Sequence, residues 1–139
     1  MDAKDEATLL RAAREALARA YAPYSRFPVG AAILCEDGSI VTGCNVENAS
    51  YGLSMCAERV ALFRAVAEGK RRFRMLAVMA HTEEPVSPCG ACRQVMAEFF
   101  QGTTPIILAN MAGQTMRTTV TDLLPRPFLP HHASKGDRV

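Results

Sequence analysis

The 139-residue sequence lacks three features that would assign it to particular protein classes. No apolar run approaches the roughly 20 residues that span a bilayer, so no membrane partner is expected. The net charge is only +2, which by itself is too small to predict a nucleic-acid surface. The amino terminus is acidic and lacks the basic-then-apolar order of a signal peptide, which predicts a cytoplasmic protein.

An even set of cysteines is also lacking. The chain has five, which argues against a closed disulfide framework. In a reducing cytosol, thiols at metal-ligand spacing are ligands more often than bridges. Cys35 and Cys44 lie in apolar, strand-like segments and are interpreted as small buried side chains. The composition is 49% hydrophobic and 22% charged, and with this length it predicts one globular domain over residues 1–139.

Strand-like and helix-like patterns alternate along the chain. Strands are expected at residues 29–35, 40–46, 75–80, 105–109 and 116–120, and helices at 5–21, 56–68 and from 88 to about 101, with a helical turn at 122–125. Asp5 is interpreted as a helix cap, and Asp37-Gly38 predicts a hairpin. Gly30 would let a helix pack close against the sheet. This order predicts an α/β fold, a three-layer α/β/α sandwich in which a mixed five-stranded sheet carries helices on both faces.

Three further segments carry predictions, and two of them, the basic run and the tail, allow more than one interpretation. The helix at 56–68 is apolar around most of its girth, which predicts deep burial. The basic run at 70–72 suits the carboxyl end of that helix, where the dipole favours cations, and a phosphate-binding patch is the alternative. Residues from about 130 are interpreted as a loose tail. In that tail His131 and His132 either bind metal or, as is more usual for adjacent tail histidines, are solvated.

Three thiols have the spacing of a metal site. Cys89 and Cys92 are three residues apart, so on a helix their side chains share one face. Both belong to the first helical turn, where unpaired backbone amides lower a thiol pKa. Cys56, at the start of another predicted helix, is the best third ligand. Three protein ligands leave the fourth position of zinc for water, so the pattern predicts a catalytic Zn²⁺ site with one ion per chain.

A carboxylate and an arginine follow the first of these thiols. Glu58 lies two residues after Cys56 and is predicted to carry a proton from water to the substrate. Three thiolates and one divalent cation leave a net negative charge, which something should offset. Arg59 is the first candidate for this charge tuning, with an ordinary solvated helix charge as the alternative, and Arg93 is the second.

Two other interpretations of the cysteines remain. A Cys-x-x-Cys pair can be a redox dithiol, but such a pair needs neither Cys56 nor Glu58. A structural zinc site needs a fourth strong ligand, and His81 has no supporting spacing. Both interpretations are therefore weaker than a catalytic site.

Four motifs resemble the small, three-cysteine class of cytidine deaminases, and the similarity runs from about residue 24 to residue 128. The motifs are Tyr24-Ser25-Arg26-Phe27-Pro28-Val29-Gly30-Ala31-Ala32, Asn45-Val46-Glu47-Asn48-Ala49-Ser50-Tyr51-Gly52, Cys56-Ala57-Glu58-Arg59 and Pro88-Cys89-Gly90-Ala91-Cys92-Arg93-Gln94. The resemblance implies hydrolytic deamination of cytidine and 2′-deoxycytidine to uridine and 2′-deoxyuridine, with release of ammonia, as in pyrimidine salvage. It implies that the three cysteines hold zinc and that Glu58 is the proton shuttle.

The resemblance also implies a nucleoside pocket. Asn45 and Glu47 match residues that bind the ribose hydroxyls, although alone they would be interpreted as loop residues. Phe27 matches an aromatic side chain that packs on the pyrimidine, and alone it would be any core phenylalanine. The backbone at Ala57 matches the part that recognises the base.

Members of this class are homotetramers whose pockets are completed by neighbouring subunits. Tyr51 and Phe128 match such positions. Arg126 departs from the family pattern, in which a smaller residue is expected.

Three rival functions fit the sequence less well. A deaminase of another cytosine compound, such as a blasticidin-type antibiotic, would have less need of Asn45 and Glu47. A polynucleotide-editing deaminase would need a basic channel, which a net charge of +2 does not favour. A non-catalytic zinc module would have no need of Glu58.

Overall fold

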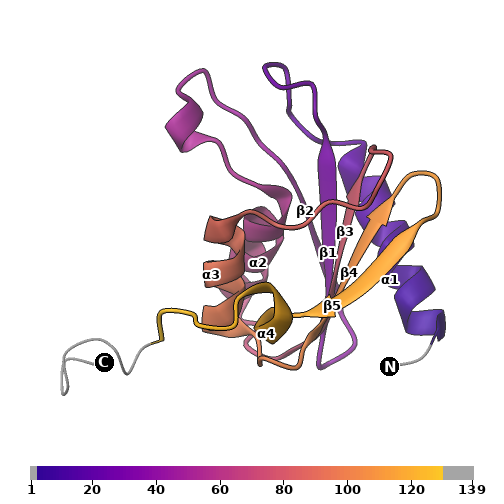
Figure 1. Ribbon diagram of the computed structural model, residues 1–139, viewed down its shortest axis with the longest axis vertical. Helices are drawn as coiled ribbons and strands as arrows, with labels where there is room; N and C mark the ends of the chain where they lie inside the picture. The colour runs from indigo at the N-terminus through magenta and orange to yellow at the C-terminus, as the bar shows by residue number, and fades with distance from the viewer. Residues whose placement is uncertain (1–2, 130–139) are drawn as a thin grey trace.

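The computed structural model describes residues 3–129, which form a five-stranded sheet and its covering helices (Figure 1). The strands are β1 (Val29–Cys35), β2 (Ile40–Cys44), β3 (Phe73–Ala80), β4 (Pro105–Asn110) and β5 (Thr115–Thr119). The helices are α1 (Ala3–Leu17), α2 (Ala57–Ala67), α3 (Gly90–Phe99) and α4 (Val120–Leu123), with a short 3-10 helix at Tyr51–Leu53. Residues 130–139, the predicted tail with its two histidines, lie outside the described residues.

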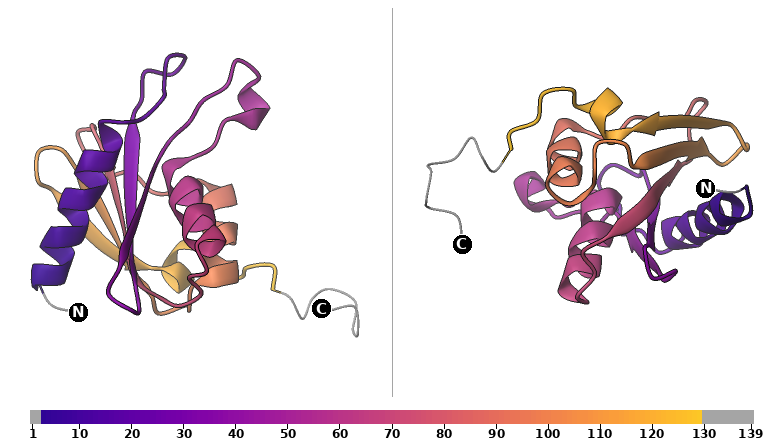
Figure 2. Two further views of the ribbon diagram at one scale, coloured as in Figure 1. Left: turned by 180° about the vertical axis from the view of Figure 1, so that it is seen from behind. Right: turned by 90° about the horizontal axis from the view of Figure 1, so that it is seen from below.

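The sheet is mixed. Its strand order is β2-β1-β3-β4-β5, with β3 and β4 parallel and the other neighbouring pairs antiparallel. Helix α1 covers one face, while α2 and α3 cover the other (Figure 2). The predicted α/β sandwich with helices on both faces is therefore confirmed.

The central strand β1 shows why both faces are covered. Every residue from Gly30 to Cys35 is buried, and side chains alternate between the two sides of a strand. Ala31 and Ile33 belong to the core under α2 and α3, whereas Ala32 and Leu34 belong to the core under α1. A strand that is apolar at every position thus requires a helix on each side.

Two glycines allow the helices to approach. A Cβ atom at Gly30 would lie 2.0 Å from the Ala13 carbonyl oxygen of α1, which confirms the predicted close packing. At Gly43 of β2, it would lie 2.4 Å from the Ala61 nitrogen of α2. Because the opposing atoms belong to helix backbone, neither position can accept a side chain without moving a helix. Gly43 thereby sets the distance between the sheet and α2. The site lies at the start of this helix.

The first predicted helix differs from α1 at both ends. Asp5 is not a cap, because α1 already includes Ala3, and its carboxylate lies inside the first turn. The helix ends at Leu17 instead of continuing to residue 21. The chain then turns so that the Tyr21 N–H donates to the Asn45 carbonyl (3.0 Å). This pairing with the chain after β2 replaces further helical hydrogen bonds.

Helix α2 is less buried than its apolar composition predicts. Only one face meets the sheet, where Ala57, Ala61, Leu62 and Ala65 are buried. Phe63 on the other side is 43% exposed, so the prediction of deep burial all round is wrong for this chain by itself. At its carboxyl end Arg71 donates to the Val66 carbonyl (2.7 Å), which confirms the helix-end interpretation of the basic run.

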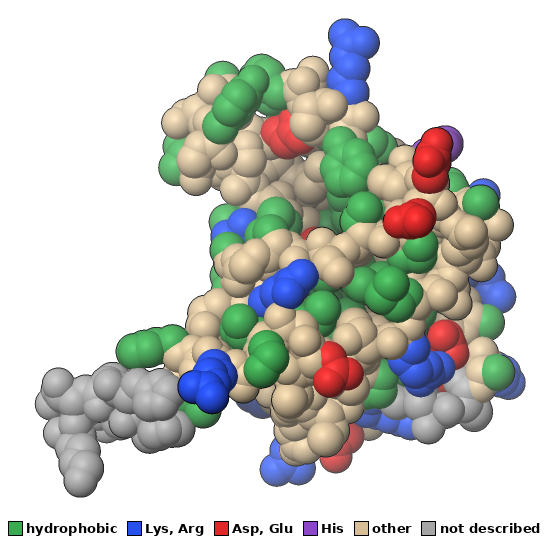
Figure 3. Space-filling model, in the orientation of Figure 1, with side chains coloured by type: hydrophobic (Ala, Val, Ile, Leu, Met, Phe, Trp, Pro, Cys, Tyr) green, Lys and Arg blue, Asp and Glu red, His purple; other side chains and the backbone are tan. Residues whose placement is uncertain are grey.

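The chain segments that build the site leave the sheet at one end. The loop before β1 and the loop between β2 and α2 both project there (Figure 1), and the surface is hollowed beneath them (Figure 3). Strand β3 ends at Ala80, and the segment after it leads to α3. The hollow therefore receives side chains from segments far apart in sequence. Among residues 3–129, no helix has the length and apolar character needed to cross a membrane.

Candidate metal centre and active site

Two helix starts bring three thiols together. Cys56 is the residue immediately before α2, Cys89 is the residue immediately before α3, and Cys92 lies in the first turn of α3. The sulfur of Cys89 is 3.8 Å from that of Cys56 and 3.5 Å from that of Cys92. All three sulfur atoms lie within 4.8 Å of one another. The predicted ligands are thus one cluster.

The local backbone turns these thiols away from ordinary capping. Cys56 and Cys89 have extended backbone angles, and neither side chain accepts a capping hydrogen bond from a backbone N–H of the helix that it precedes. The sulfur atoms remain available to a cation. They also lie at the positive ends of two helix dipoles, which favour thiolate over thiol.

The thiols differ in how easily they ionise. The hydrogen bond with Cys92 and the nearby Arg59 guanidinium lower the pKa of Cys56 to about 5, against the opposing effect of burial. The same Cys56 contact and burial raise the pKa of Cys92. One thiolate therefore forms readily, whereas a second next to it is opposed. A divalent cation between them would remove that opposition, and tetrahedral sulfur coordination is typical of zinc, so this donor set fits zinc.

Arg59 lies against the cluster. Its Nη2 donates to the Cys56 sulfur at 3.5 Å, and among the described residues its buried Nε has no hydrogen-bond partner. Arg93, the second candidate, has other contacts, since its Nε and Nη1 donate to the carbonyl oxygens of Pro88 and Leu123. The geometry therefore favours Arg59 for offsetting thiolate charge.

Glu58 combines burial with a position beside the cluster. It lies in the first turn of α2 and is only 7% exposed. Burial disfavours its ionised form and raises its pKa to about 7, with the nearby Cys56 charge acting in the same direction. A carboxyl group with this pKa is about half protonated at neutral pH, so it can both accept and return a proton.

A cavity of about 210 Å³ lies beside the cluster and receives most of the predicted site. Its lining residues are Phe27, Val29, Asn45, Cys56, Ala57, Glu58, Val78, Val86, Ser87 and Cys89. The sequence analysis assigned no role to Val86 or Ser87. The only sequence signal for them is their position just before the Pro88-Cys89 motif.

The Asn45 side chain is hydrogen-bonded to backbone groups of the segment that lines the cavity. Its Oδ1 accepts from the Val29 N–H (2.8 Å), and its Nδ2 donates to the Phe27 carbonyl (2.9 Å). The side chain is largely buried, at 8% exposure. Asn45 therefore fixes the turn that presents Phe27. An amide nitrogen has two hydrogens, so one donor besides the Phe27 bond can serve a ligand.

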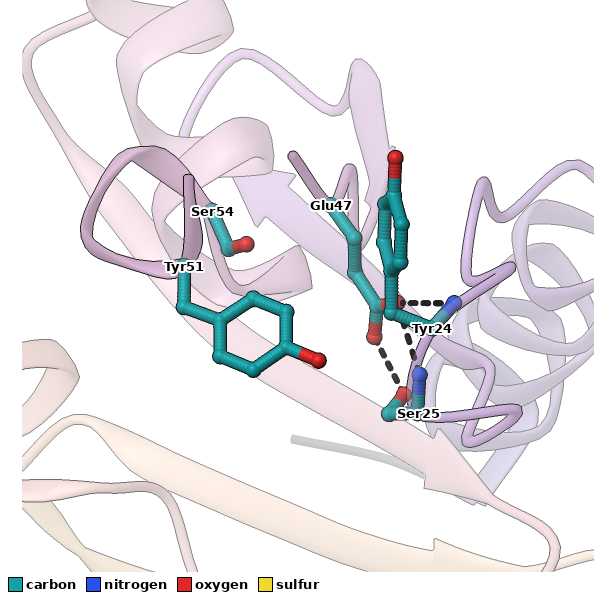
Figure 4. A pocket seen from close by; sticks show the side chains of 5 residues that line it. All are labelled: Tyr24, Ser25, Glu47, Tyr51 and Ser54. Carbon is teal, nitrogen blue, oxygen red and sulfur yellow. Dashed lines mark hydrogen bonds between the residues drawn. The ribbon is translucent and has the colours of Figure 1, made fainter. Parts of the chain in front are cut away.

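Glu47 lies in a second cavity of about 290 Å³, lined also by Tyr24, Ser25, Tyr51 and Ser54 (Figure 4). Its carboxylate accepts from the N–H groups of Tyr24 (3.1 Å) and Ser25 (3.0 Å) and from the Ser25 hydroxyl. These bonds, the hydroxyl first, hold the pKa of Glu47 below its usual value. A carboxylate fixed and ionised in this way presents acceptors to a hydroxyl-bearing ligand.

The two predicted aromatic contributors lie apart from the cluster. Tyr51 lines the Glu47 cavity, and its ring meets Tyr24 edge-on with 6.0 Å between centroids, yet it is 74% exposed. Phe128 lines neither cavity and is 63% exposed. Within one chain, Phe128 therefore does not contribute to the hollow.

Three comparisons with known proteins agree with this geometry. The family described as "Cytidine and deoxycytidylate deaminase zinc-binding region" matches residues 3–108. The chain is 55% identical to a cytidine deaminase of Sporosarcina psychrophila over 124 residues, covering 89% of this chain and 91% of the relative. It is 53% identical to one of Halalkalibacterium halodurans, covering 89% and 94% of the two chains. The crystal structure of cytidine deaminase from Burkholderia pseudomallei superposes with a TM-score of 0.87 at 51% identity, covering 92% of this chain and 100% of that one.

Proposed function

Because the chain belongs to the cytidine and deoxycytidylate deaminase family, we propose that its three-thiol site carries out the zinc-dependent hydrolytic deamination of cytidine. The reaction is cytidine plus water giving uridine plus ammonia. The observation that carries this proposal is the cluster of three thiols with a buried carboxylate beside it and a cavity in front.

In this proposal Cys56, Cys89 and Cys92 hold one zinc ion per chain. When bound, zinc supplies Lewis-acid chemistry, lowering the pKa of a water molecule so that it can attack the ring. Arg59 offsets the excess negative charge of three thiolates, which is supported by its contact with the Cys56 sulfur. Its buried Nε, which has no partner among the described residues, is a further donor available in the loaded site.

Glu58 manages the protons of the reaction. Its carboxylate accepts a proton from the attacking water and delivers it to the ring nitrogen N3. It then takes the proton of the hydroxyl group added at C4 and delivers it to the amino group, which leaves as ammonia while the C4 carbonyl forms. The pKa of about 7 suits this shuttling, because neither protonation state is strongly favoured at neutral pH. Burial of the carboxylate keeps bulk water from competing for the proton.

The remaining cavity residues orient the nucleoside. Phe27 packs on the pyrimidine ring, and the backbone at Ala57 recognises the base, a role supported by the place of both residues in the cavity beside the thiols. Asn45 and Glu47 bind ribose hydroxyls, since one offers an amide donor and the other a fixed carboxylate. Neither role requires the 2′-hydroxyl alone, so 2′-deoxycytidine is proposed as a second substrate.

An ultraviolet assay with zinc analysis tests this function. Purified protein is expected to convert cytidine and 2′-deoxycytidine to their uracil counterparts, with about one zinc per chain, as a single three-ligand site requires. Zinc without turnover of either nucleoside would contradict the substrate and favour another aminated pyrimidine, such as a blasticidin-type compound. A folded protein that binds no zinc would contradict the site itself.

The working unit is proposed to be a homotetramer whose pockets are completed by neighbouring subunits. Support comes from large apolar side chains that a single chain leaves exposed: Tyr51, Leu53, Phe63 and Phe128. Burying such side chains drives association. Tyr51 and Phe128 are proposed to enter the pocket of another subunit. Light scattering of an active preparation should give the mass of four chains, and a monomeric mass would contradict the assembly.

Mixed oligomers can locate the site of action of Phe128. Glu58→Gln and Phe128→Ala chains are each expected to be impaired alone. When they are co-expressed, about a quarter of randomly mixed pockets should combine an intact Glu58 with an intact Phe128 from a neighbour. Activity well above the sum of the two separate variants is therefore expected. No gain in verified mixed oligomers would show that Phe128 serves its own chain, because no chain carries both intact residues.

The cellular setting is also proposed from indirect support. All five cysteines are free thiols, which suits a reducing cytoplasm and a thiolate metal site. The reaction produces a uracil nucleoside from cytidine, which suits a role in pyrimidine salvage. Separately, residues 1–139 are proposed to form one domain. Growth of a pyrimidine-requiring strain on cytidine, with this chain as its one deaminase, tests the role, and failure to grow would contradict it.

A further inference from the structure

The helix that carries two of the thiols also holds a distant segment by an unusual pair of contacts. Gln94 of α3 follows Cys92 by two residues. Its Nε2 donates to the Phe128 carbonyl at 2.7 Å, and its Oε1 accepts from the Phe128 N–H at 3.1 Å. Both polar atoms of one side chain are thus used on the backbone of one residue.

This pairing fixes orientation as well as distance. A side-chain amide offers the same donor and acceptor as a peptide group, so Gln94 takes the place of a neighbouring strand toward Phe128. One hydrogen bond would leave the chain free to turn about it, whereas two bonds to the same residue restrict that rotation. Holding the Phe128 backbone in this way sets the direction in which its ring projects.

The neighbouring Arg93 anchors the start of the same segment. Arg93 Nη1 donates to the Leu123 carbonyl (2.8 Å), where α4 ends, and Nε donates to the Pro88 carbonyl (2.8 Å), next to the Cys89 ligand. In the described chain no helix or strand includes residues 124–129, here called the C-terminal strap. Adjacent residues of α3 therefore hold Leu123, just before the strap, and Phe128, near its other end.

We propose that Gln94 is a positioning residue for the deamination, which holds the C-terminal strap so that Phe128 is presented to a neighbouring subunit's pocket. The inference rests on the proposed function, in which Phe128 completes that pocket. Phe128 is 63% exposed and lines neither cavity of its own chain. Its backbone is held by the two hydrogen bonds to the Gln94 side chain. Gln94 thus acts on the substrate only through Phe128.

A double-mutant cycle separates this role from a general contribution to α3. Gln94→Met keeps the length of the side chain and removes both hydrogen bonds. It is expected to raise KM for cytidine about tenfold, the size expected from two hydrogen bonds of ordinary net strength, with a smaller change in kcat. In a Phe128→Ala background the same substitution should change KM less than about twofold, because there is no ring left to position.

Two further measurements make the test specific. Gln101→Met is the matched control, since it makes the same chemical change at an exposed position outside the described contacts of the strap, and its kinetics should equal those of the parent chain. Hydrogen exchange of the Phe128 amide should accelerate in Gln94→Met while zinc content stays unchanged. This exchange readout does not require turnover, so it reports the contact independently of the proposed function.

The outcomes are distinguishable. Equal effects of Gln94→Met with and without Phe128, or no effect on KM, would overturn the proposal. Loss of zinc or of the folded state in Gln94→Met would make Gln94 a structural residue of α3 and would overturn it as well. If Phe128→Ala alone left the kinetics unchanged, the proposed role of Phe128 would fail first. In that case accelerated exchange in Gln94→Met would show a strap contact with no part in catalysis.

Discussion

Glu58→Gln is expected to lower the turnover of cytidine by about 10³-fold or more while zinc content stays at that of the parent chain. The amide is nearly isosteric with the carboxyl group but cannot accept and return a proton, and positioned proton transfer contributes up to roughly 10⁴-fold to such reactions. The substitution is made in the first turn of α2, where Glu58 is only 7% exposed. The measurement is kcat from the ultraviolet assay together with zinc analysis.

The same variant makes a prediction about stability in the metal-free protein. Burial raises the pKa of Glu58 from 4.5 to about 7, so the stability associated with its protonated form is lost as the pH rises through 7. A neutral glutamine loses nothing over that range. Urea unfolding should therefore show metal-free Glu58→Gln to be more stable than the parent chain above pH 7, by up to roughly 3 kcal/mol, and similar to it below pH 4.5.

Glu98→Gln is the matched control for both measurements. Glu98 is an exposed residue of α3, outside both cavities, so the same chemical change should leave kcat and stability unchanged. Substantial turnover by Glu58→Gln, within about tenfold of the parent, would contradict the proposed proton shuttle.

Cys89→Ala is the second substitution with a large expected effect. Two thiols would remain, and a tetrahedral ion held by two protein ligands is held weakly, so zinc is expected to be lost on dialysis and activity to fall below about 1%. Cys89 is exposed, so its replacement creates little internal cavity and the sheet should stay folded. Zinc analysis, the ultraviolet assay and circular dichroism measure the three outcomes.

Cys44→Ala provides the comparison within the same chain. Cys44 lies in β2, away from the thiol cluster, and its thiol donates to the Arg19 carbonyl at 3.5 Å. Its removal should leave zinc and kcat unchanged. Retention of stoichiometric zinc by Cys89→Ala would show that the ion is held elsewhere.

The metal cluster could be predicted from sequence because its geometry is mostly local. Cys89 and Cys92 are related by one helical turn, and Cys56 and Glu58 by the first turn of another helix, so spacing alone sets their relative directions. What spacing did not supply is the 3.8 Å approach of Cys56 to Cys89 across 33 residues. That approach requires the sheet to place the starts of α2 and α3 side by side.

Other contacts of the site had no local signal. Ser87 lines the cavity because the loop after β3 passes over it, and the hydrogen bonds of Glu47 to Tyr24 and Ser25 join two loops that are neighbours only after β1 and β2 pair. Spacing ranked Arg59, three residues after Cys56, ahead of Arg93 for offsetting charge, but it did not show the contacts of either arginine. Both follow a cysteine of the cluster, and only the packed structure directs Arg93 to backbone carbonyls.

The sequence by itself determined the order of strands and helices, the need for helices on both faces of the sheet, and the residue types of a catalytic thiolate site. These follow from patterns within a few turns or strand positions, where chain geometry fixes the distances. The tertiary structure decided which segments meet: the joining of the two cysteine helices, the burial that raises the pKa of Glu58, and the exposed side of α2 at Phe63. These depend on packing between distant parts of the chain, because burial and approach distance belong to the folded whole and not to any short stretch of residues.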